Sequence, residues 1–331
     1  MLGFNGDKNS IDPNDSQRDF KLIEKIVSDA FSEQKKARLW GNVFKGLTFL
    51  YLFLVLILFY PGMQKAISSG GGNKPHTAVV LLRGPIMDDK PAVAWRVNAA
   101  LRNAFENKHS KAVILAINSP GGSPVQSAYI YDEIRRLRTK YPDKKLYAVI
   151  SDMCASGGYY VASAADEIYA NRSSLVGSIG VTASGFGFVN LLEKLGVERR
   201  HYTAGEHKAF LDPFSPKNEE ETAFWQEVLN QTHAQFIDAV KQGRGERLKI
   251  TDDITSGLIW NGEQAKSLGL IDGLGSASYV AREVIGEEEM VSYNIPESPL
   301  EKVLKSFGVS VGEGFAGYFM KQNSVAPYSN L

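Results

Sequence analysis

The stretch Asp152-Met-Cys-Ala-Ser-Gly-Gly-Tyr-Tyr-Val-Ala-Ser-Ala-Ala-Asp166 is the part of this sequence around which the rest is arranged. It follows the apolar run Leu146-Tyr-Ala-Val-Ile150, which is typical of a buried strand, and it continues into residues that favour a helix. A serine at such a strand-to-helix turn, here Ser156, can present its hydroxyl to a substrate while the first helical amides point at the same spot. The same residues also fit a tight turn in which Ser156 is an ordinary helix cap. Taken alone, the stretch leaves both interpretations open.

On both sides of this stretch, predicted strands and helices alternate along the chain. The predicted strands are 77–83, 112–118, 146–150, 167–170, 178–182 and 198–203, and the predicted helices are 91–107, 124–139, 159–165, 188–195 and 216–242. Elements of this length in this order indicate an α/β domain whose strands are largely parallel. A further helix, at 19–38, is indicated by apolar residues at helical spacing.

The composition excludes several classes of protein. The chain has 331 residues, of which 44% are hydrophobic, enough for one large domain or two smaller ones. Basic and acidic residues balance at 37 each, so we expect no nucleic-acid partner. The single cysteine, Cys154, excludes an intramolecular disulfide framework and a cysteine-cluster metal site. With no metal, nucleotide or phosphate motif in the sequence, we expect no cofactor.

A long apolar run, Leu47-Thr-Phe-Leu-Tyr-Leu-Phe-Leu-Val-Leu-Ile-Leu-Phe-Tyr60, lies near the N-terminus. It is shorter than the roughly 20 residues that a membrane-spanning helix needs, but Val43 and Phe44 extend it, with Lys45 reaching back to the interface. We therefore expect a single transmembrane anchor at 40–63. A buried core helix would not need such uniform hydrophobicity, and a cleaved signal peptide would start earlier and end at a small-x-small site.

The basic residues around this run predict its orientation. Four of them precede or open the run and two follow it: Lys35, Lys36, Arg38 and Lys45 before, Lys65 and Lys74 after. Because basic residues are enriched on the cytoplasmic side of a span, we expect the N-terminus in the cytoplasm and everything after residue 63 outside it.

A second glycine-rich turn, Asn118-Ser-Pro-Gly-Gly-Ser123, lies between a predicted buried strand and a predicted helix. Paired glycines there let the backbone approach a ligand and point amides at it, which is the geometry of an oxyanion hole, although a plain turn would look the same. If both turns follow neighbouring parallel strands, they open at the same end of the sheet.

A serine nucleophile needs a base, and none of the five histidines lies in a recognisable triad context. Lys208 lies in the run Thr203-Ala-Gly-Glu-His-Lys-Ala-Phe-Leu-Asp-Pro-Phe214, between apolar residues. A lysine can act as a base only as the free amine, which burial favours, so we expect Phe210 and Leu211 to surround it. A loop lysine is otherwise a solvated surface charge, and His207 is the rival base.

Taken together, these motifs resemble the signal peptide peptidase A family, in its short bacterial form with a single catalytic domain. Four motifs occur in the family's order: Asn118-Ser-Pro-Gly-Gly122, Ala155-Ser-Gly-Gly-Tyr-Tyr160, Val176-Gly-Ser-Ile-Gly-Val181 and Gly205-Glu-His-Lys208. With the anchor, the resemblance covers about residues 40–285. It implies an α/β fold similar to the Clp protease and crotonase group, with stacked β-β-α units.

The resemblance also implies roles for individual residues. Ser156 takes the position of the nucleophile and Lys208 that of the base in a serine–lysine dyad. Ser178 matches a serine thought to orient the lysine, while Gly157 and the pair Gly121-Gly122 match the oxyanion region. Related enzymes form closed rings in which the serine and the lysine come from adjacent domains or protomers, so the resemblance implies a homo-oligomer.

The expected function is that of a membrane-anchored serine endopeptidase that degrades cleaved signal peptides and other hydrophobic peptides at the outer face of a bacterial inner membrane. The alternatives are a crotonase-like acyl-transfer enzyme and a non-catalytic membrane scaffold of the same fold. The expected organisation is a cytoplasmic segment at 1–39, the anchor at 40–63, a linker at 64–76, a catalytic peptidase domain at 77–295 and a tail at 296–331.

Overall fold

A computed structural model describes residues 13–68, 74–88 and 90–295 of the chain. The chain divides into two compact units, Met1–Lys65 and Ala66–Leu331. The start of the predicted N-terminal segment, 1–12, part of the predicted linker, 69–73, and the predicted tail, 296–331, lie outside the described residues.

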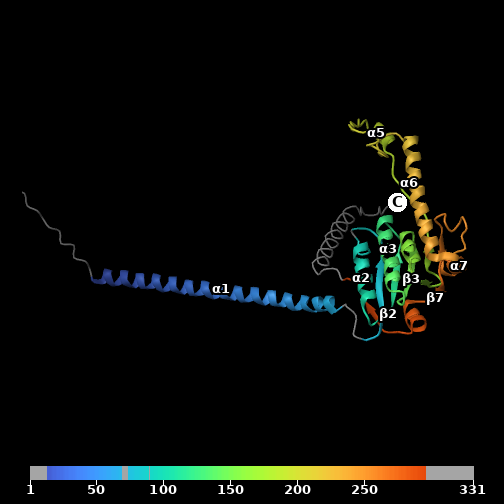
Figure 1. The fold of residues 1–331 in the computed structure, drawn as a ribbon. Helices are drawn as coiled ribbons and strands as arrows, with labels where there is room; N and C mark the ends of the chain where they lie inside the picture. Colours follow the sequence, from blue (N-terminus) through green and yellow to red (C-terminus); the bar gives the residue numbers. More distant parts are fainter. Residues whose placement is uncertain (1–12, 69–73, 89, 296–331) are drawn as a thin grey trace, which may run out of the picture. The chain divides into compact units, whose positions relative to one another are not determined.

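The first unit consists of most of one long helix, α1 (Pro13–Ser68) (Figure 1). This confirms the helix predicted at 19–38 and continues it through the predicted anchor. Among the residues that the structure describes in full, no helix combines the length and the apolar character that crossing a membrane requires. The side chains of 56–63, the second part of the predicted anchor, lie outside that set, so the anchor is not confirmed.

The second unit is built on one sheet, confirming the α/β class predicted from the sequence. Its described strands are β1 (His76–Arg83), β2 (Ser110–Ser119), β3 (Leu146–Ala155), β4 (Glu167–Ala170), β5 (Leu175–Gly177), β6 (Ile259–Asn261), β7 (Gly273–Leu274) and β8 (Met290–Ser292). The main order is β6-β5-β3-β2-β1-β8, with β4 pairing to both β3 and β7. Every described pair is parallel except β5 with β6, so the carboxyl ends of β1, β2 and β3 meet at one edge.

Helices connect these strands. They are α2 (Ala94–Glu106), α3 (Pro124–Lys140), α4 (Gly157–Ser163), α5 (Val189–Lys194), α6 (Glu219–Arg244), α7 (Gly262–Ser267) and α8 (Ala277–Tyr279), with the short turns η1 (Gly245–Arg247) and η2 (Val280–Ile285). Two helix starts follow directly from local sequence. Ser123 caps α3 by accepting a bond from the Gln126 amide, with Pro124 at the first helical position. Asn218 caps α6 by accepting from the amides of Glu220 and Glu221.

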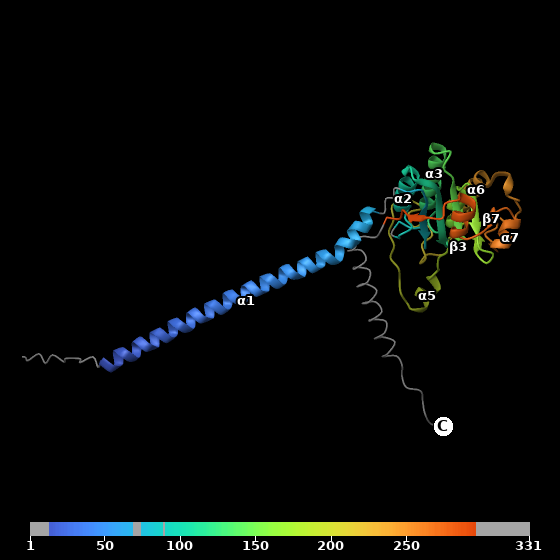
Figure 2. The same cartoon turned by 90° about the horizontal axis from the view of Figure 1, so that it is seen from below.

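Alternation along β2 explains how the helices cover the sheet. Val113, Leu115 and Ile117 are fully buried in the large core shared with α2, α3 and α4, whereas Ile114 belongs to a smaller cluster with Val280 of η2. Successive side chains of a strand point to opposite faces, so an apolar strand such as this one must be covered on both sides. Figure 2 shows the sheet and these helices from a second direction.

Two predicted strands are wrong. No ladder forms at 178–182, because Ser178 adopts a left-handed φ of 54° and its amide donates to the Leu258 carbonyl oxygen at 2.7 Å. The strand of this region is instead the short β5, which ends at Gly177, one residue before Ser178. The second wrong strand, 198–203, has no partner among the described residues and is irregular. The strands predicted at 77–83, 112–118, 146–150 and 167–170 are confirmed, although β3 continues to Ala155.

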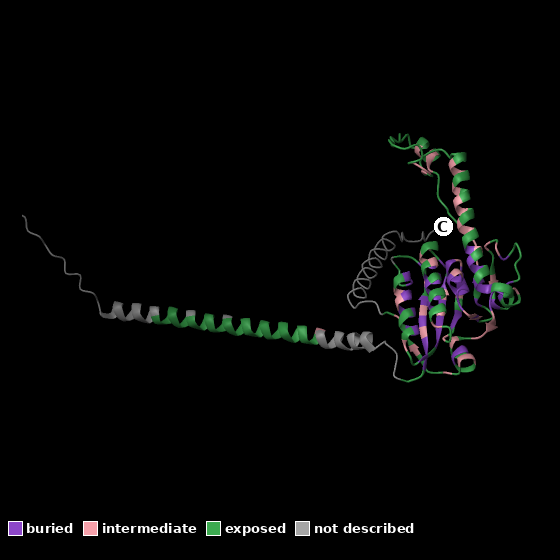
Figure 3. Ribbon diagram, in the orientation of Figure 1, coloured by how far each residue is buried: buried purple, intermediate pink, exposed green. Residues whose placement is uncertain are grey.

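Residues 183–225, here called the arm, project from the rest of the second unit. The arm holds α5, the loop that follows it and the first turns of α6 (Figure 1). All of its residues are described and none is buried, whereas the buried residues of α6 begin at Phe236, in the part of the helix that packs against α4 (Figure 3). The arm is held together by its own aromatic contacts, including Phe188 stacked on Phe214 with ring centroids 5.3 Å apart.

Candidate active site

Ser156 lies at the junction of β3 and α4, at the carboxyl edge of the sheet. It caps α4 with a backbone φ of 51°, a left-handed conformation that a serine rarely adopts. Two bonds hold it there: the Ser156 amide donates to the Gly177 carbonyl oxygen at 2.8 Å, and the Tyr160 amide donates to the Ser156 carbonyl oxygen at 2.9 Å. A strained residue held at a strand-to-helix turn is typical of a functional site, and here it places a hydroxyl at the N-terminus of a helix.

Of the two glycines of the Asn118–Ser123 turn, Gly121 lies directly against Ser156 and Gly122 lies against Ile86. A Cβ atom added at Gly121 would lie 2.7 Å from the Ser156 Cβ and 2.7 Å from the Gly157 nitrogen, so only glycine fits there. A Cβ atom at Gly122 would overlap the Ile86 carbonyl oxygen. Both glycines also have positive φ, 98° and 149°, which adds a second reason for their identity.

Two backbone amides near Ser156 are placed to stabilise negative charge. Gly157 is the first residue of α4, so its amide has no acceptor within the helix. The Gly122 amide is not used by the two bonds that fasten this turn to Ile86, which run from the Ile86 amide to Gly121 and from the Ser123 amide to Ile86. Two such amides beside a serine hydroxyl are what an oxyanion hole requires.

A cleft of about 680 Å³ opens around these groups. Ser156, Gly157, Gly122 and Ser178 all line it, so the structure brings together four of the residues singled out in the sequence, with Gly121 directly behind. Much of the remaining lining is apolar: Val125 and Ala128 from α3, Tyr160 from α4, Val181, and Phe236 from α6. The volume and the apolar walls suit an extended peptide with small or aliphatic side chains.

Lys208 is not among the described residues that line this cleft. It lies on the arm, in the loop between α5 and α6, where its side chain is exposed. Its amine has no hydrogen-bond partner among the described residues, and the expectation that Phe210 and Leu211 bury it is wrong for the single chain, since Leu211 is itself 46% exposed. The rival base, His207, lies in the same loop, and its side chain is 58% exposed. None of the five histidines, all described, lines the cleft.

Cys154, two residues before Ser156, is fully buried in the core beneath the cleft. Burial raises the pKa of its thiol far above the ordinary value, so the reactive thiolate is not populated in the folded chain. Its role is that of a small apolar residue of the core.

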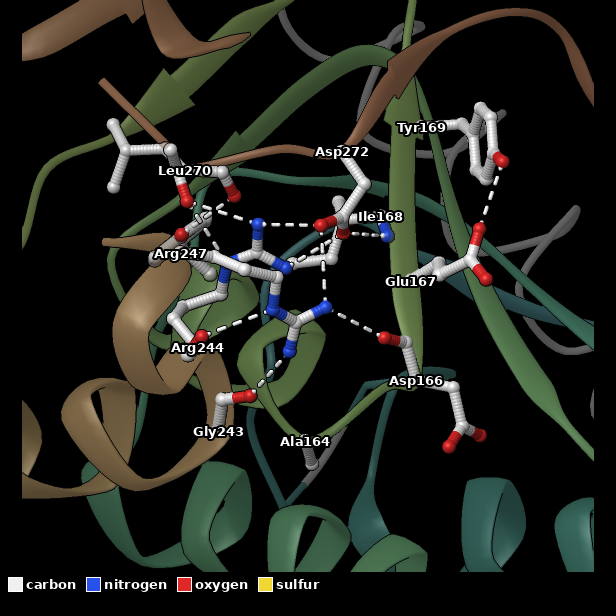
Figure 4. A network of polar contacts seen from close by, with 12 residues as sticks. Ala164, Asp166, Glu167, Ile168, Tyr169, Gly243, Arg244, Arg247, Leu270 and Asp272 are labelled. Atoms are coloured by element: carbon white, nitrogen blue, oxygen red, sulfur yellow. Dashed lines mark hydrogen bonds and ion pairs between the residues drawn. The ribbon is translucent and has the colours of Figure 1, made fainter. Parts of the chain in front are cut away.

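A network of charged groups fastens the base of α6 to the body of the unit (Figure 4). The buried Arg244 guanidinium donates to both carboxylate oxygens of Asp272, at 2.7 and 3.0 Å, and to the Gly269 carbonyl oxygen. Arg247 donates to Asp272 at 3.2 Å and to the backbone oxygen of Asp166 at 2.8 Å. Asp272 in turn accepts from the Ile168 amide of β4 at 2.7 Å.

This network sets the charge of Asp272. Burial acts to raise the pKa of its carboxyl, but the hydrogen bonds and charge of Arg244, with help from the Ile168 amide and Arg247, outweigh burial and hold the pKa below its ordinary value. Close to the network, Gly243 of α6 meets the Ser163 carbonyl oxygen so closely that a Cβ atom would overlap it. The helix that carries part of the arm is therefore fixed at its C-terminal end against α4, the helix that directly follows Ser156.

Sequence reasoning missed several residues of the cleft. Thr232 and Gln235 of α6 and the turn Ser256-Gly257 line it, although none belongs to a motif. Their place follows from the packing of α6 and of the chain before β6 against the carboxyl edge of the sheet. No local signal in the sequence marks such long-range contacts.

Comparison with known proteins gives a consistent result. Residues 138–290 match the family model of peptidase family S49. A putative protease of Methanocaldococcus jannaschii is 31% identical over 210 residues, which is 62% of this chain and 67% of that protein. A putative signal peptide peptidase SppA of Enterococcus faecium is 36% identical over 175 residues, 53% of this chain and 50% of that protein.

A third relative is longer. A protein of Brucella abortus named Na(+)/H(+) antiporter NhaA is 43% identical over 254 residues, 75% of this chain. The chain matches about a third of that relative's length, 33%. The name describes the Brucella protein as a whole.

Proposed function

The chain belongs to the peptidase S49 family, and from this premise we propose that it is a serine peptidase with Ser156 as its nucleophile and Lys208 as its general base. The observation that carries the first assignment is the left-handed Ser156 at the N-terminus of α4, between the glycine pair and the first helical amide. The second assignment rests on the Gly205-Glu-His-Lys208 motif, which resembles that of the family.

In the proposed reaction, the Ser156 hydroxyl oxygen attacks the carbonyl carbon of the scissile peptide bond. The neutral Lys208 amine takes the hydroxyl proton and gives it to the departing amine nitrogen, which leaves an acyl ester on Ser156. The amides of Gly122 and Gly157 hold the oxyanion of the tetrahedral intermediate. Water then attacks the ester, with the same lysine as base, and the free Ser156 hydroxyl returns.

We further propose that the lysine which serves each Ser156 comes from a neighbouring copy of the chain. In the single chain Lys208 is exposed on the arm and is not among the described residues that line the cleft with Ser156. Docking of the arm onto the cleft of another copy would bury the amine and bring it to a serine. The exposed aromatic side chains of the arm, among them Phe186 and Tyr202 at 80% and 88%, are suited to such an interface.

The proposed substrates are hydrophobic peptides, including remnants of signal peptides. Support comes from the apolar lining of the cleft by Val125, Tyr160 and Phe236, and from the name of the Enterococcus relative. We expect small or aliphatic side chains next to the cleaved bond, because the cleft offers few charged partners for a charged one.

We also propose that residues 40–63 anchor the chain in a bacterial inner membrane, with the N-terminus in the cytoplasm and the peptidase domain outside. Support comes from the apolar run Leu47–Tyr60 and the basic residues before it. An anchor of this kind would keep the cleft near the place where signal peptide remnants are released.

A fluorophosphonate probe on the full-length chain tests the nucleophile. We expect labelling of the wild type and of Ser173→Ala, which removes an exposed serine of the same domain, and no labelling of Ser156→Ala. Labelling of Ser156→Ala at an unchanged rate would contradict the assignment. A wild-type chain that is folded and assembled but neither reacts with the probe nor cleaves peptides would favour the non-catalytic scaffold.

A further inference from the structure

The loop that carries Lys208 is a series of tight turns without a regular helix. The Lys208 amide donates to the Gly205 carbonyl oxygen at 3.1 Å, the Phe210 amide to His207 at 3.1 Å and the Asp212 amide to Ala209 at 3.1 Å. Such turns define the local backbone path, but they do not fix the loop relative to the rest of the arm. The end of the loop is fixed by Asp212, which pairs with Arg199, and by the Pro213 carbonyl oxygen, which accepts from the Phe188 amide at 2.7 Å, while α6 contacts the part around Lys208.

Glu221, in the first turn of α6, reaches the loop on both sides of Lys208. One carboxylate oxygen, Oε2, accepts a bond from the Leu211 amide at 3.4 Å, and the other, Oε1, lies 3.7 Å from His207 Nδ1. The Glu221 side chain is only 16% exposed, whereas the Glu219 side chain in the same helical turn is 83% exposed. The carboxylate is therefore turned inward onto the loop.

The backbone of Leu211 gives this contact further weight. Leu211 has a φ of 55°, a left-handed conformation that a leucine adopts only when its surroundings impose it. The Glu221 carboxylate accepts from the amide of that same residue. The bond therefore acts on a residue of the loop whose backbone conformation is unfavourable.

An aromatic contact adds to the contacts that the Glu221 carboxylate makes with the loop. The Phe210 ring meets the rings of Phe224 and Trp225 on α6 edge-on, each with centroids 5.8 Å apart. The turn 207–211 therefore contacts α6 at three residues: His207 and Leu211 through Glu221, and Phe210 through the two aromatic rings. Since α6 is itself fixed at its C-terminal end through Arg244, the place of Lys208 is defined relative to a rigid helix.

We propose that Glu221 is a positioning residue for Lys208. Its carboxylate holds His207 and Leu211, a contact here called the clamp, and so it presents the lysine between them to the cleft of a neighbouring copy. This inference rests on the proposed role of Lys208 as the base.

Three variants of the full-length chain test the clamp. Glu221→Ala removes both contacts, Glu221→Gln keeps an oxygen that can accept from the Leu211 amide but loses the charge, and Glu220→Ala removes a carboxylate from the same helical turn as a matched control. For each, kcat and KM are measured on an apolar fluorogenic peptide, and hydrogen exchange is followed in 204–216. Thermal unfolding and assembly are checked in parallel.

We expect Glu221→Ala to lower kcat and to speed exchange at the Leu211 amide, each by about tenfold or more, because a bond to a charged acceptor is lost. KM should stay nearly unchanged, since no peptide-binding group is altered. Glu221→Gln should lie between Glu221→Ala and the wild type, and Glu220→Ala should match the wild type in both measurements. If Glu221→Ala does not fold, the Glu221→Gln result decides.

The outcomes separate this inference from the proposed function. Wild-type kcat in Glu221→Ala, or an equal loss in Glu220→Ala, would overturn the clamp if Lys208→Ala is inactive. Full activity of Lys208→Ala would overturn the assignment of the base, and the clamp would fall with it. An inactive Lys208→Ala with a selective kcat loss in Glu221→Ala supports both.

Discussion

Mixing two inactive chains provides the sharpest test of how the active site is completed. Ser156→Ala keeps the proposed base and lacks the nucleophile, whereas Lys208→Ala keeps the nucleophile and lacks the base. Each is expected to be inactive alone. The structure motivates the experiment, because Ser156 lines the cleft of the body while Lys208 lies exposed on the arm of the same chain.

The size of the recovery follows from the arrangement. In a closed ring with one serine and one lysine per chain, each site pairs a serine with the lysine of one neighbour. In an equal mixture, half of the serines are intact and half of the neighbouring lysines are intact. With random assembly, about a quarter of the sites are complete, so about a quarter of the wild-type activity should return.

The assay requires mixed assemblies, so the two chains are co-expressed with different tags and purified through both in turn. Peptidase activity is then compared with that of a matched mixture in which the second chain carries both substitutions and can complete no site. We expect recovery in the first mixture and none in the second. Mixed assemblies that show no recovery would refute the sharing of sites and place the lysine of each chain at its own serine.

Three further predictions concern the body of the domain. Arg244→Ala should lower the free energy of unfolding, measured by denaturant titration, by about 3 kcal/mol, because the partly buried Asp272 carboxylate then keeps only Arg247 as a cation. The control Arg200→Ala, which breaks an exposed pair, should have no measurable effect. The Asp272 carboxylate should stabilise the fold above the ordinary aspartate pKa and lose this effect as pH falls through its lower folded pKa, so Asp272→Asn should flatten that part of an acid-unfolding curve. Cys154 should resist thiol reagents in the folded chain and react after denaturation, as mass spectrometry can show; rapid labelling without unfolding would contradict its burial.

The parts of the fold that could be predicted from sequence are those whose signal is local. β1, β2, β3 and β4 are runs that could be recognised from their apolar residues, and α3 begins at a visible cap, Ser123. The two glycine-rich turns could be placed at one edge because parallel strands with helical crossovers put their carboxyl ends together. The candidate nucleophile and the oxyanion glycines follow from that placement.

The predictions that failed depended on partners that lie far away in the sequence. The segments 178–182 and 198–203 have the composition of strands, yet a strand exists only where a neighbour offers its backbone groups. The chain leaves the direction of the strand at Ser178, so 178–182 forms no ladder. The segment 198–203 lies on the arm, where the described chain has no strand beside it. In the same way, β6 is only three residues long and depends on pairing with β5, which no local pattern indicates.

Lys208 shows a different limit, because the sequence does not tell how its amine is surrounded. The same sequence motif fits a solvated loop lysine and a buried base, and in the single chain the side chain is exposed. The nucleophile and the oxyanion amides, by contrast, lie where sheet, helix and glycine turn meet, in the best-packed part of the domain. If the arm docks on another copy, one half of the site is formed by folding and the other half by assembly. A free chain would then carry a serine without a base, which would keep it from cleaving peptides before it reaches its partners.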